Sequence, residues 1–145
     1  MEDTYLSQHF RLSEFTRSAT ASARGIDNTP SASAIDNLRR LCQEVLEPLR
    51  RHLDRPVVIS SGYRCKKLND RVGGSKNSQH TKGQAADIAS DAPIHLAQIV
   101  IDRGLDFDQM ILYPNFIHLS YTLERANRKQ ILYSKDYYGP KLESL

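Results

Sequence analysis

Apolar residues recur at intervals of three and four positions through the segment 28–53, which is the spacing of one buried face of a helix. The members of this face are Ile35, Leu38, Leu41, Cys42, Val45, Leu46 and Leu49. Pro30, followed by Ser31 or Ser33, predicts where the helix begins. Pro48 lacks the amide proton of the helix ladder, so we expect it to bend or break the last turn.

Shorter apolar runs predict the strands. The run 57–60 predicts a buried strand that leads into a glycine turn, and 85–89 predicts a second strand. The stretch 92–104 predicts an amphipathic helix, and "FDQMILYPNFIHLSYTL" predicts a hairpin that turns at Pro114 and Asn115. Helices and hairpins that do not alternate regularly indicate an α+β fold with a largely antiparallel sheet.

The bulk composition is that of an ordinary globular protein. The 145 residues suffice for one domain, 1–145, with a core that needs no disulfide bonds. A hydrophobic content of 39% and a charged content of 26% argue against disorder. Cys42 and Cys65 are too few for a disulfide framework and lack the spacing of metal ligands. We therefore expect a compact monomer.

Charge and hydropathy narrow the choice of partners. The net charge of +3 is spread along the chain, which speaks against a nucleic-acid partner but suits an anionic substrate such as a cell-wall polymer. No apolar run reaches the length of a membrane span, and "MEDTYLSQHF" lacks the regions of a signal peptide. We therefore expect synthesis in the cytoplasm and no membrane partner. The basic residues Arg125, Arg128 and Lys129 are interpreted as a solvated face.

Strand alternation brings an aspartate and a histidine toward one sheet face. Asp87 lies at the centre of 85–89, and His118 shares a face with Phe116 and Ser120. If the two strands are neighbours, Asp87 and His118 lie side by side, and His80 on the preceding loop can join them. Two imidazoles and one carboxylate with an open fourth position make up a catalytic zinc site. The alternative is a satisfied buried acid with structural histidines. The remaining histidines are interpreted as surface or packing residues: His9, His52 and His95.

Three motifs carry a resemblance to a known family. "SSGYR", "SQHTKGQAADI" and "FIHLSY" resemble the zinc D-alanyl-D-alanine carboxypeptidases and the phage L-alanyl-D-glutamate endolysin peptidases. The family pattern is Ser-x-His-x-x-Gly-x-Ala-x-Asp with a later histidine. It falls here on Ser78, His80, Gly83, Ala85, Asp87 and His118. The resemblance implies the fold of the Hedgehog signalling domain and the D,D-peptidases: a small, mostly antiparallel sheet packed by helices, with the zinc site on the sheet face.

The resemblance also implies roles for individual residues. His80, Asp87 and His118 would hold Zn²⁺ and leave one position for water, whose pKa zinc lowers to about 7. Arg64 occupies the place of an arginine that stabilises the developing oxyanion or binds a substrate carboxylate. Ser78 would either orient its loop or touch the substrate.

The sequence departs from the family at the general base. Several branches carry Glu, Asp or His two to five residues before the last zinc histidine, whereas 113–116 offer none of these. Asp108 is the nearest upstream acid and is the candidate base. A two-residue hairpin loop would pair Ile111 with His118 and place Gln109 on the metal face, while a three-residue loop would bring Asp108 there. Tyr113 could donate a hydrogen bond to the intermediate.

The sequence therefore predicts a zinc metallopeptidase that hydrolyses peptidoglycan stem peptides, as a carboxypeptidase or as an endolysin-type endopeptidase. Such a protein would act on the cell wall after release from the cytoplasm. Two alternatives stay open, because the base is missing: a zinc-dependent wall-binding module, and a structural phage component without turnover.

Overall fold

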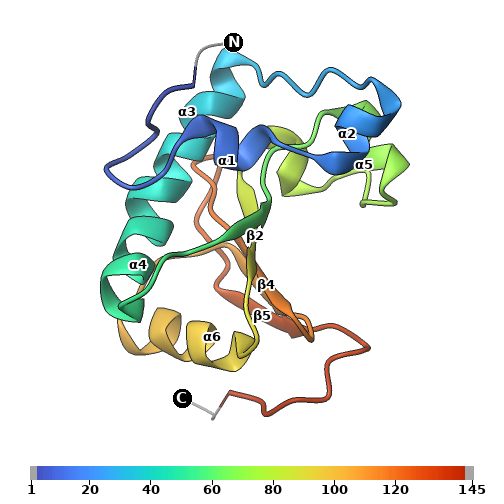
Figure 1. Ribbon diagram of the computed structural model, residues 1–145. Coiled ribbons are helices and arrows are strands. Elements are labelled where there is room, and N and C mark those ends of the chain that lie inside the picture. The colour runs from blue at the N-terminus through green and yellow to red at the C-terminus, as the bar shows by residue number, and fades with distance from the viewer. Residues whose placement is uncertain (1–2, 143–145) are drawn as a thin grey trace.

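A computed structural model describes residues 3–142 of the chain (Figure 1). Its sheet has five strands in the order β1-β2-β4-β3-β5. The strands are β1 (Ile59–Ser61), β2 (Ala85–Ala89), β3 (Gln109–Leu112), β4 (Phe116–Ser120) and β5 (Gln130–Tyr133). The helices are α1 (Leu12–Thr16), α2 (Ala19–Arg24), α3 (Ala32–Leu41), α4 (Glu47–Leu53), α5 (Lys66–Arg71) and α6 (Pro93–Asp102), with two irregular turns, η1 (Cys42–Leu46) and η2 (Gln79–Lys82). The expected α+β class is confirmed.

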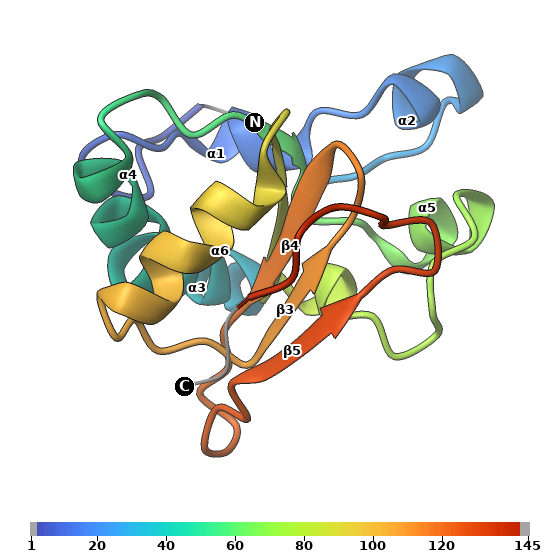
Figure 2. The same cartoon turned by 90° about the horizontal axis from the view of Figure 1, so that it is seen from below.

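The helices α3, α4 and α6 cover one face of the sheet, as Figure 2 shows. The strand residues that face them are fully buried in the main core: Ala86, Ile88, Met110, Leu112, Ile117 and Leu119. Because side chains alternate along a strand, the intervening residues, with Asp87 and His118 among them, point to the other face. This second face carries the candidate site.

The long helix is continuous, but it changes its winding before Pro48. A π-helical turn, η1, joins α3 to α4, and the amide of Glu47 donates to the carbonyl of Cys42. Pro48 follows this turn directly, where the winding returns to that of an α-helix. Pro48 does not break the last turn, because the helix runs on to Leu53, and the irregularity near the proline takes the form of the π-helical turn ahead of it.

The sheet is mixed, which corrects the expected largely antiparallel arrangement. The first three pairings along the sheet are antiparallel, whereas β5 pairs with β3 in parallel. The cause is the connection 121–129, which carries the chain from β4 past its hairpin partner β3 to the far edge. A strand that returns antiparallel to β4 must run parallel to β3.

The hairpin of β3 and β4 has a two-residue loop, Pro114 and Asn115, which decides between the two loop lengths that the sequence left open. The amide of Tyr113 donates to the carbonyl of Phe116 at 3.0 Å, and Ile111 pairs with His118. This register places Gln109, Ile111 and Tyr113 on the same face as His118. Within residues 3–142, the structure contains no helix long and apolar enough to cross a membrane.

Candidate metal centre

The pairing of β2 with β4 sets two side chains opposite each other. Asp87 and His118 are direct partners in this antiparallel ladder. His118 Nδ1 lies 3.0 Å from Asp87 Oδ1, so the two side chains meet on the face that the helices leave uncovered. The expectation that Asp87 and His118 lie side by side is confirmed.

His80 reaches the same point from the turn η2. The hydroxyl of Ser78 accepts from the amide of His80 at 3.2 Å and caps the turn, and Gly83 closes it with φ +74°. A Cβ at Gly83 would lie 2.4 Å from the carbonyl oxygen of Ala34, so only glycine fits there. His80 is therefore held in one place by its own turn and by α3.

The orientation of the His80 ring is set by a backbone carbonyl. Nδ1 lies 2.6 Å from the carbonyl oxygen of Gly62, which can only accept, so Nδ1 carries the proton. Nε2 then faces Asp87 Oδ1 at 3.2 Å. Such a second hydrogen bond fixes the tautomer in which the other nitrogen is free to bind a metal.

These three side chains form the one cluster of His, Cys, Asp or Glu with metal-site geometry found in residues 3–142. One ligand atom from each lies within 4.8 Å of the other two. The lone pair of His80 Nε2 and the carboxylate oxygen of Asp87 are both acceptors, so their approach requires a proton or a cation between them. Two imidazoles and one carboxylate fit Zn²⁺, with room for a fourth ligand.

Burial and charge set the protonation of this cluster. Burial alone would raise the pKa of Asp87, but the close contacts with the ring nitrogens of His118 and His80 outweigh it and hold the pKa well below its usual range. Burial lowers the pKa of His118, against the opposing effect of Asp87. The cluster thus contains an ionised carboxylate beside the His118 imidazole, which burial disfavours from charging, and this is the state a metal requires.

Arg64 borders the cluster with an unused donor. Its backbone amide donates to the carbonyl of His80 at 3.0 Å, which ties the loop after β1 to the metal-ligand turn. The side-chain Nε is buried and has no hydrogen-bond partner within residues 3–142. Burial lowers the pKa of Arg64, while Asp87 and Tyr113 favour its charged form. A buried donor without a partner beside a cleft is suited to a bound ligand.

A cavity of about 650 Å³ lies over the cluster. The cavity is lined by the three metal-site residues together with Arg64, Ser78, Gln109 and Tyr113. It therefore brings together the candidate site residues from the sequence, except Asp108. The Tyr113 ring stacks on Phe116, with 4.1 Å between centroids, and forms one wall. Burial, with a smaller effect from Asp87, raises the pKa of Tyr113, so its hydroxyl keeps its proton at neutral pH.

The structure places Asp108 in a different environment from that of a general base. Its side chain is fully buried and bound by Arg125, Arg128 and Gln79. Burial would raise the pKa of Asp108, but hydrogen bonds from Arg125 and Arg128 hold it well below its usual range. A carboxylate with this pKa and both oxygens engaged does not accept a proton readily, so the structure argues against the role expected for Asp108.

Gly62 is a site residue that the sequence analysis did not single out. Its carbonyl orients His80, and a Cβ on it would lie 2.6 Å from the backbone of Phe15 in α1.

We expect Gly62→Ala to push the strand end away from α1 and to weaken zinc binding at least about 10-fold, as loss of an outer-shell partner does. Titration with a competing chelator measures this, and Gly104→Ala, at a position with open space, is the control for backbone strain alone. Unchanged zinc affinity in Gly62→Ala would show that the carbonyl does not control His80.

Comparison with known proteins agrees with the motifs. A sequence model of the family described as Peptidase M15 matches residues 8–120. The chain is also similar to the zinc D-Ala-D-Ala carboxypeptidase of Streptomyces albus G, with 33% identity over 63 residues, 43% of this chain and 24% of that protein. The match thus spans about a quarter of the length of that relative. The family resemblance in the sequence is confirmed: the chain belongs to the Peptidase M15 family.

Proposed function

We propose that this protein is a zinc peptidase that hydrolyses peptide bonds in peptidoglycan stem peptides. The observation that carries the proposal is the convergence of His80 and His118 on one oxygen of Asp87, at the floor of a cavity that also holds Arg64. The name of the Streptomyces relative and the chemistry of the donor set both point to Zn²⁺. When bound, zinc supplies Lewis acidity and lowers the pKa of a water ligand to about 7.

The residues of the chain itself would bind the metal and orient the substrate. His80, held by Gly62, and His118, held by its ladder partner, present nitrogen ligands, and Asp87 supplies the charge. Arg64, which lines the cavity, would grip a substrate carboxylate or the developing oxyanion with its planar guanidinium group. Tyr113, protonated at neutral pH, would donate a hydrogen bond to the intermediate. The side-chain amide of Gln109 would contact the substrate backbone. The cap by Ser78 supports a loop-orienting role for this residue.

Hydrolysis of purified peptidoglycan, with and without a chelator, tests the function. We expect release of peptide fragments that stops on chelation and returns with Zn²⁺, and mass spectrometry of the fragments identifies the bond. The endolysin type and the carboxypeptidase type differ in whether an internal or a terminal bond is cut. Absence of any chelator-sensitive fragment at saturating zinc would contradict the proposal.

A second candidate is a zinc-dependent module that binds wall peptide without turnover. The absence of an acid or a histidine at 113–116 and the ion pairing of Asp108 favour it. Sedimentation of the protein with insoluble peptidoglycan, combined with the absence of fragments, would support this candidate over the peptidase.

Arg64→Lys separates catalysis from folding. We expect kcat/KM to fall by about 10²–10³-fold, as for loss of an oxyanion donor, because lysine keeps the charge but loses the planar fork. The melting temperature should stay near that of the parent. The matched control is Arg51→Lys on the exposed surface of α4, which should leave both quantities unchanged. Equal kcat/KM for Arg64→Lys and the parent would remove Arg64 from the mechanism.

A further inference from the structure

Asp108 holds two arginines of the β4–β5 connection at the edge of the metal-site cavity. Its Oδ2 accepts from Nη2 of Arg125 at 3.0 Å and from Nη2 of Arg128 at 2.9 Å. Its Oδ1 accepts from the backbone amide of Arg128 at 3.0 Å and from Nε at 3.1 Å. Gln79, next to the metal-site residue His80, donates to Oδ2 at 3.1 Å. The pair of arginines is thus fixed relative to the metal-ligand turn.

The cluster carries one positive charge in excess. Two guanidinium groups face a single carboxylate, and each arginine side chain is 47% exposed, whereas Asp108 is fully buried beneath them. On the same rim, Lys82 and Glu124 pair with each other at 3.3 Å and add no net charge. The solvated face expected from the sequence is confirmed, because Arg125, Arg128 and Lys129 are all exposed, and the structure adds that Arg125 and Arg128 are ion-paired to the buried Asp108.

The guanidinium group of Arg128 keeps a donor for a ligand. The bonds from Arg128 to Asp108 use the edge formed by Nε and Nη2. Its Nη1 has no protein acceptor in residues 3–142, and both arginines line the cavity that contains His80, Asp87 and His118. A guanidinium whose rotamer is already fixed loses less entropy when it grips a second carboxylate.

The position of the cluster complements that of Arg64. Ile111 of β3 is level with His118, Tyr113 lies two positions beyond Ile111 and lines the cavity with Arg64, and Asp108 precedes the other end of the strand. Ile111 lies three positions after Asp108, which is about 10 Å at 3.3 Å per residue. An extended peptide bound across the metal site therefore reaches the arginines within about three of its residues.

We propose that Arg125 and Arg128 form a carboxylate-binding corner of the cleft, which selects stem peptides that carry a free α-carboxylate on their γ-linked glutamate within three residues of the cleaved bond. This inference rests on the proposed function for its substrate class. It assigns the two arginines to substrate selection at a point separate from Arg64. A substrate whose glutamate carboxylate is converted to the carboxamide loses the ionic partner of the corner.

Two synthetic stem peptides that differ only in this group, carboxylate or carboxamide, test the corner on the zinc-loaded full chain. An equimolar mixture gives the ratio of kcat/KM values from the two products by mass spectrometry. If neither peptide is cleaved, isothermal titration gives the ratio of the two Kd values instead. We expect a preference of at least about 10-fold for the carboxylate, which corresponds to one charge-assisted hydrogen bond.

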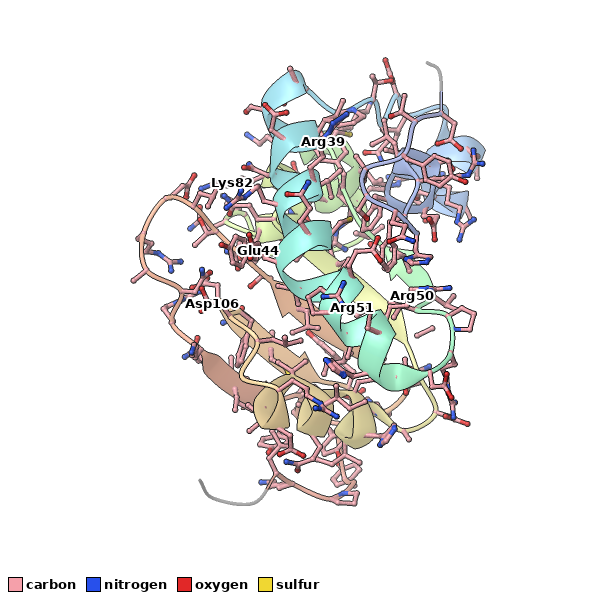
Figure 3. All side chains as sticks on the ribbon, turned by 90° about the vertical axis from the view of Figure 1, so that its left-hand side faces the viewer. Arg39, Glu44, Arg50, Arg51, Lys82 and Asp106 are labelled. Carbon is pink, nitrogen blue, oxygen red and sulfur yellow. The ribbon has the colours of Figure 1, made fainter. Side chains whose placement is uncertain are left out.

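Arg125→Gln and Arg128→Gln should each bring this ratio toward one. Because both peptides meet the same sample, a loss of folded protein cancels from the kcat/KM ratio, and the titrated stoichiometry corrects the Kd values. Arg51→Gln makes the same change of charge on α4, remote from Lys82 at the cleft rim (Figure 3), and should keep the parent ratio.

A ratio of one in the parent, no binding of either peptide, or a preference retained in both variants would overturn the corner. Cleavage of both peptides with a ratio of one would leave the peptidase standing and remove the corner. A carboxylate preference in binding without any cleavage would support the corner and contradict the peptidase.

Discussion

Replacing His118 by alanine is expected to abolish both zinc binding and peptide hydrolysis. His118 supplies one of three ligand atoms that converge within 4.8 Å, and two ligands do not make a closed zinc site. Its loss should therefore lower zinc affinity by more than the about 10–100-fold that loss of an outer-shell partner costs. Elemental analysis after dialysis and hydrolysis of peptidoglycan measure the two effects.

The matched control is His52→Ala, at an exposed position near the end of α4, which should keep one zinc per chain. One zinc per chain in His118→Ala would mean that the metal is held elsewhere and would remove the proposed ligand set. Retained zinc with lost hydrolysis would assign His118 to chemistry and not to metal binding.

Asp108→Asn is expected to destabilise the fold and not to act as a selective catalytic lesion. The substitution removes the charge that holds two arginines, and hydrogen bonds to charged groups contribute about 1.5–3 kcal/mol each to stability. The midpoint of urea unfolding should fall accordingly. Zinc affinity should fall less than it does in His118→Ala, since no ligand is lost. A general base would behave in the opposite way, with unchanged stability and a turnover lowered by about 10²–10⁴-fold.

The pH dependence of unfolding provides an independent check on Asp108. Its folded pKa lies below the unfolded value of about 3.9, so its stabilising contribution is complete above that value and is lost as the pH falls through the folded pKa. The stability difference between the parent and Asp108→Asn should therefore shrink as the pH falls below about 4. Asp106→Asn, on the exposed surface nearby, is the control and should show a smaller difference at every pH.

The parts of the site that follow from local chain geometry could be predicted. Alternation along two strands puts Asp87 and His118 on one face, and the chemistry of Pro114 and Asn115 sets the hairpin register that pairs Ile111 with His118. The seven-residue spacing of His80 and Asp87 allows a turn to fold back onto the strand.

The parts that depend on distant segments could not be predicted. The arginine partners of Asp108 lie 17 and 20 residues further along the chain, in a connection without periodicity, so proximity to the hairpin suggested a catalytic role instead. The parallel β5 depends on the same connection. The close approach of Gly62 to Phe15 joins the end of a strand to a helix far upstream, and no spacing along the chain indicates it.

With His80, Asp87 and His118 as the proposed ligands, the pairing of β2 with β4 also links zinc occupancy to the folding equilibrium. His80 and Asp87 are close in sequence, but His118 lies 31 residues beyond Asp87 and joins them only when the two strands pair. An unfolded chain offers zinc two neighbouring ligands at best, so the ion binds the native state in preference. By mass action, free zinc at 1,000 times its Kd would add about 4 kcal/mol to the free energy of unfolding. The melting temperature would then rise with the concentration of free zinc. A chelator would lower the free energy of unfolding even though every core side chain keeps its place.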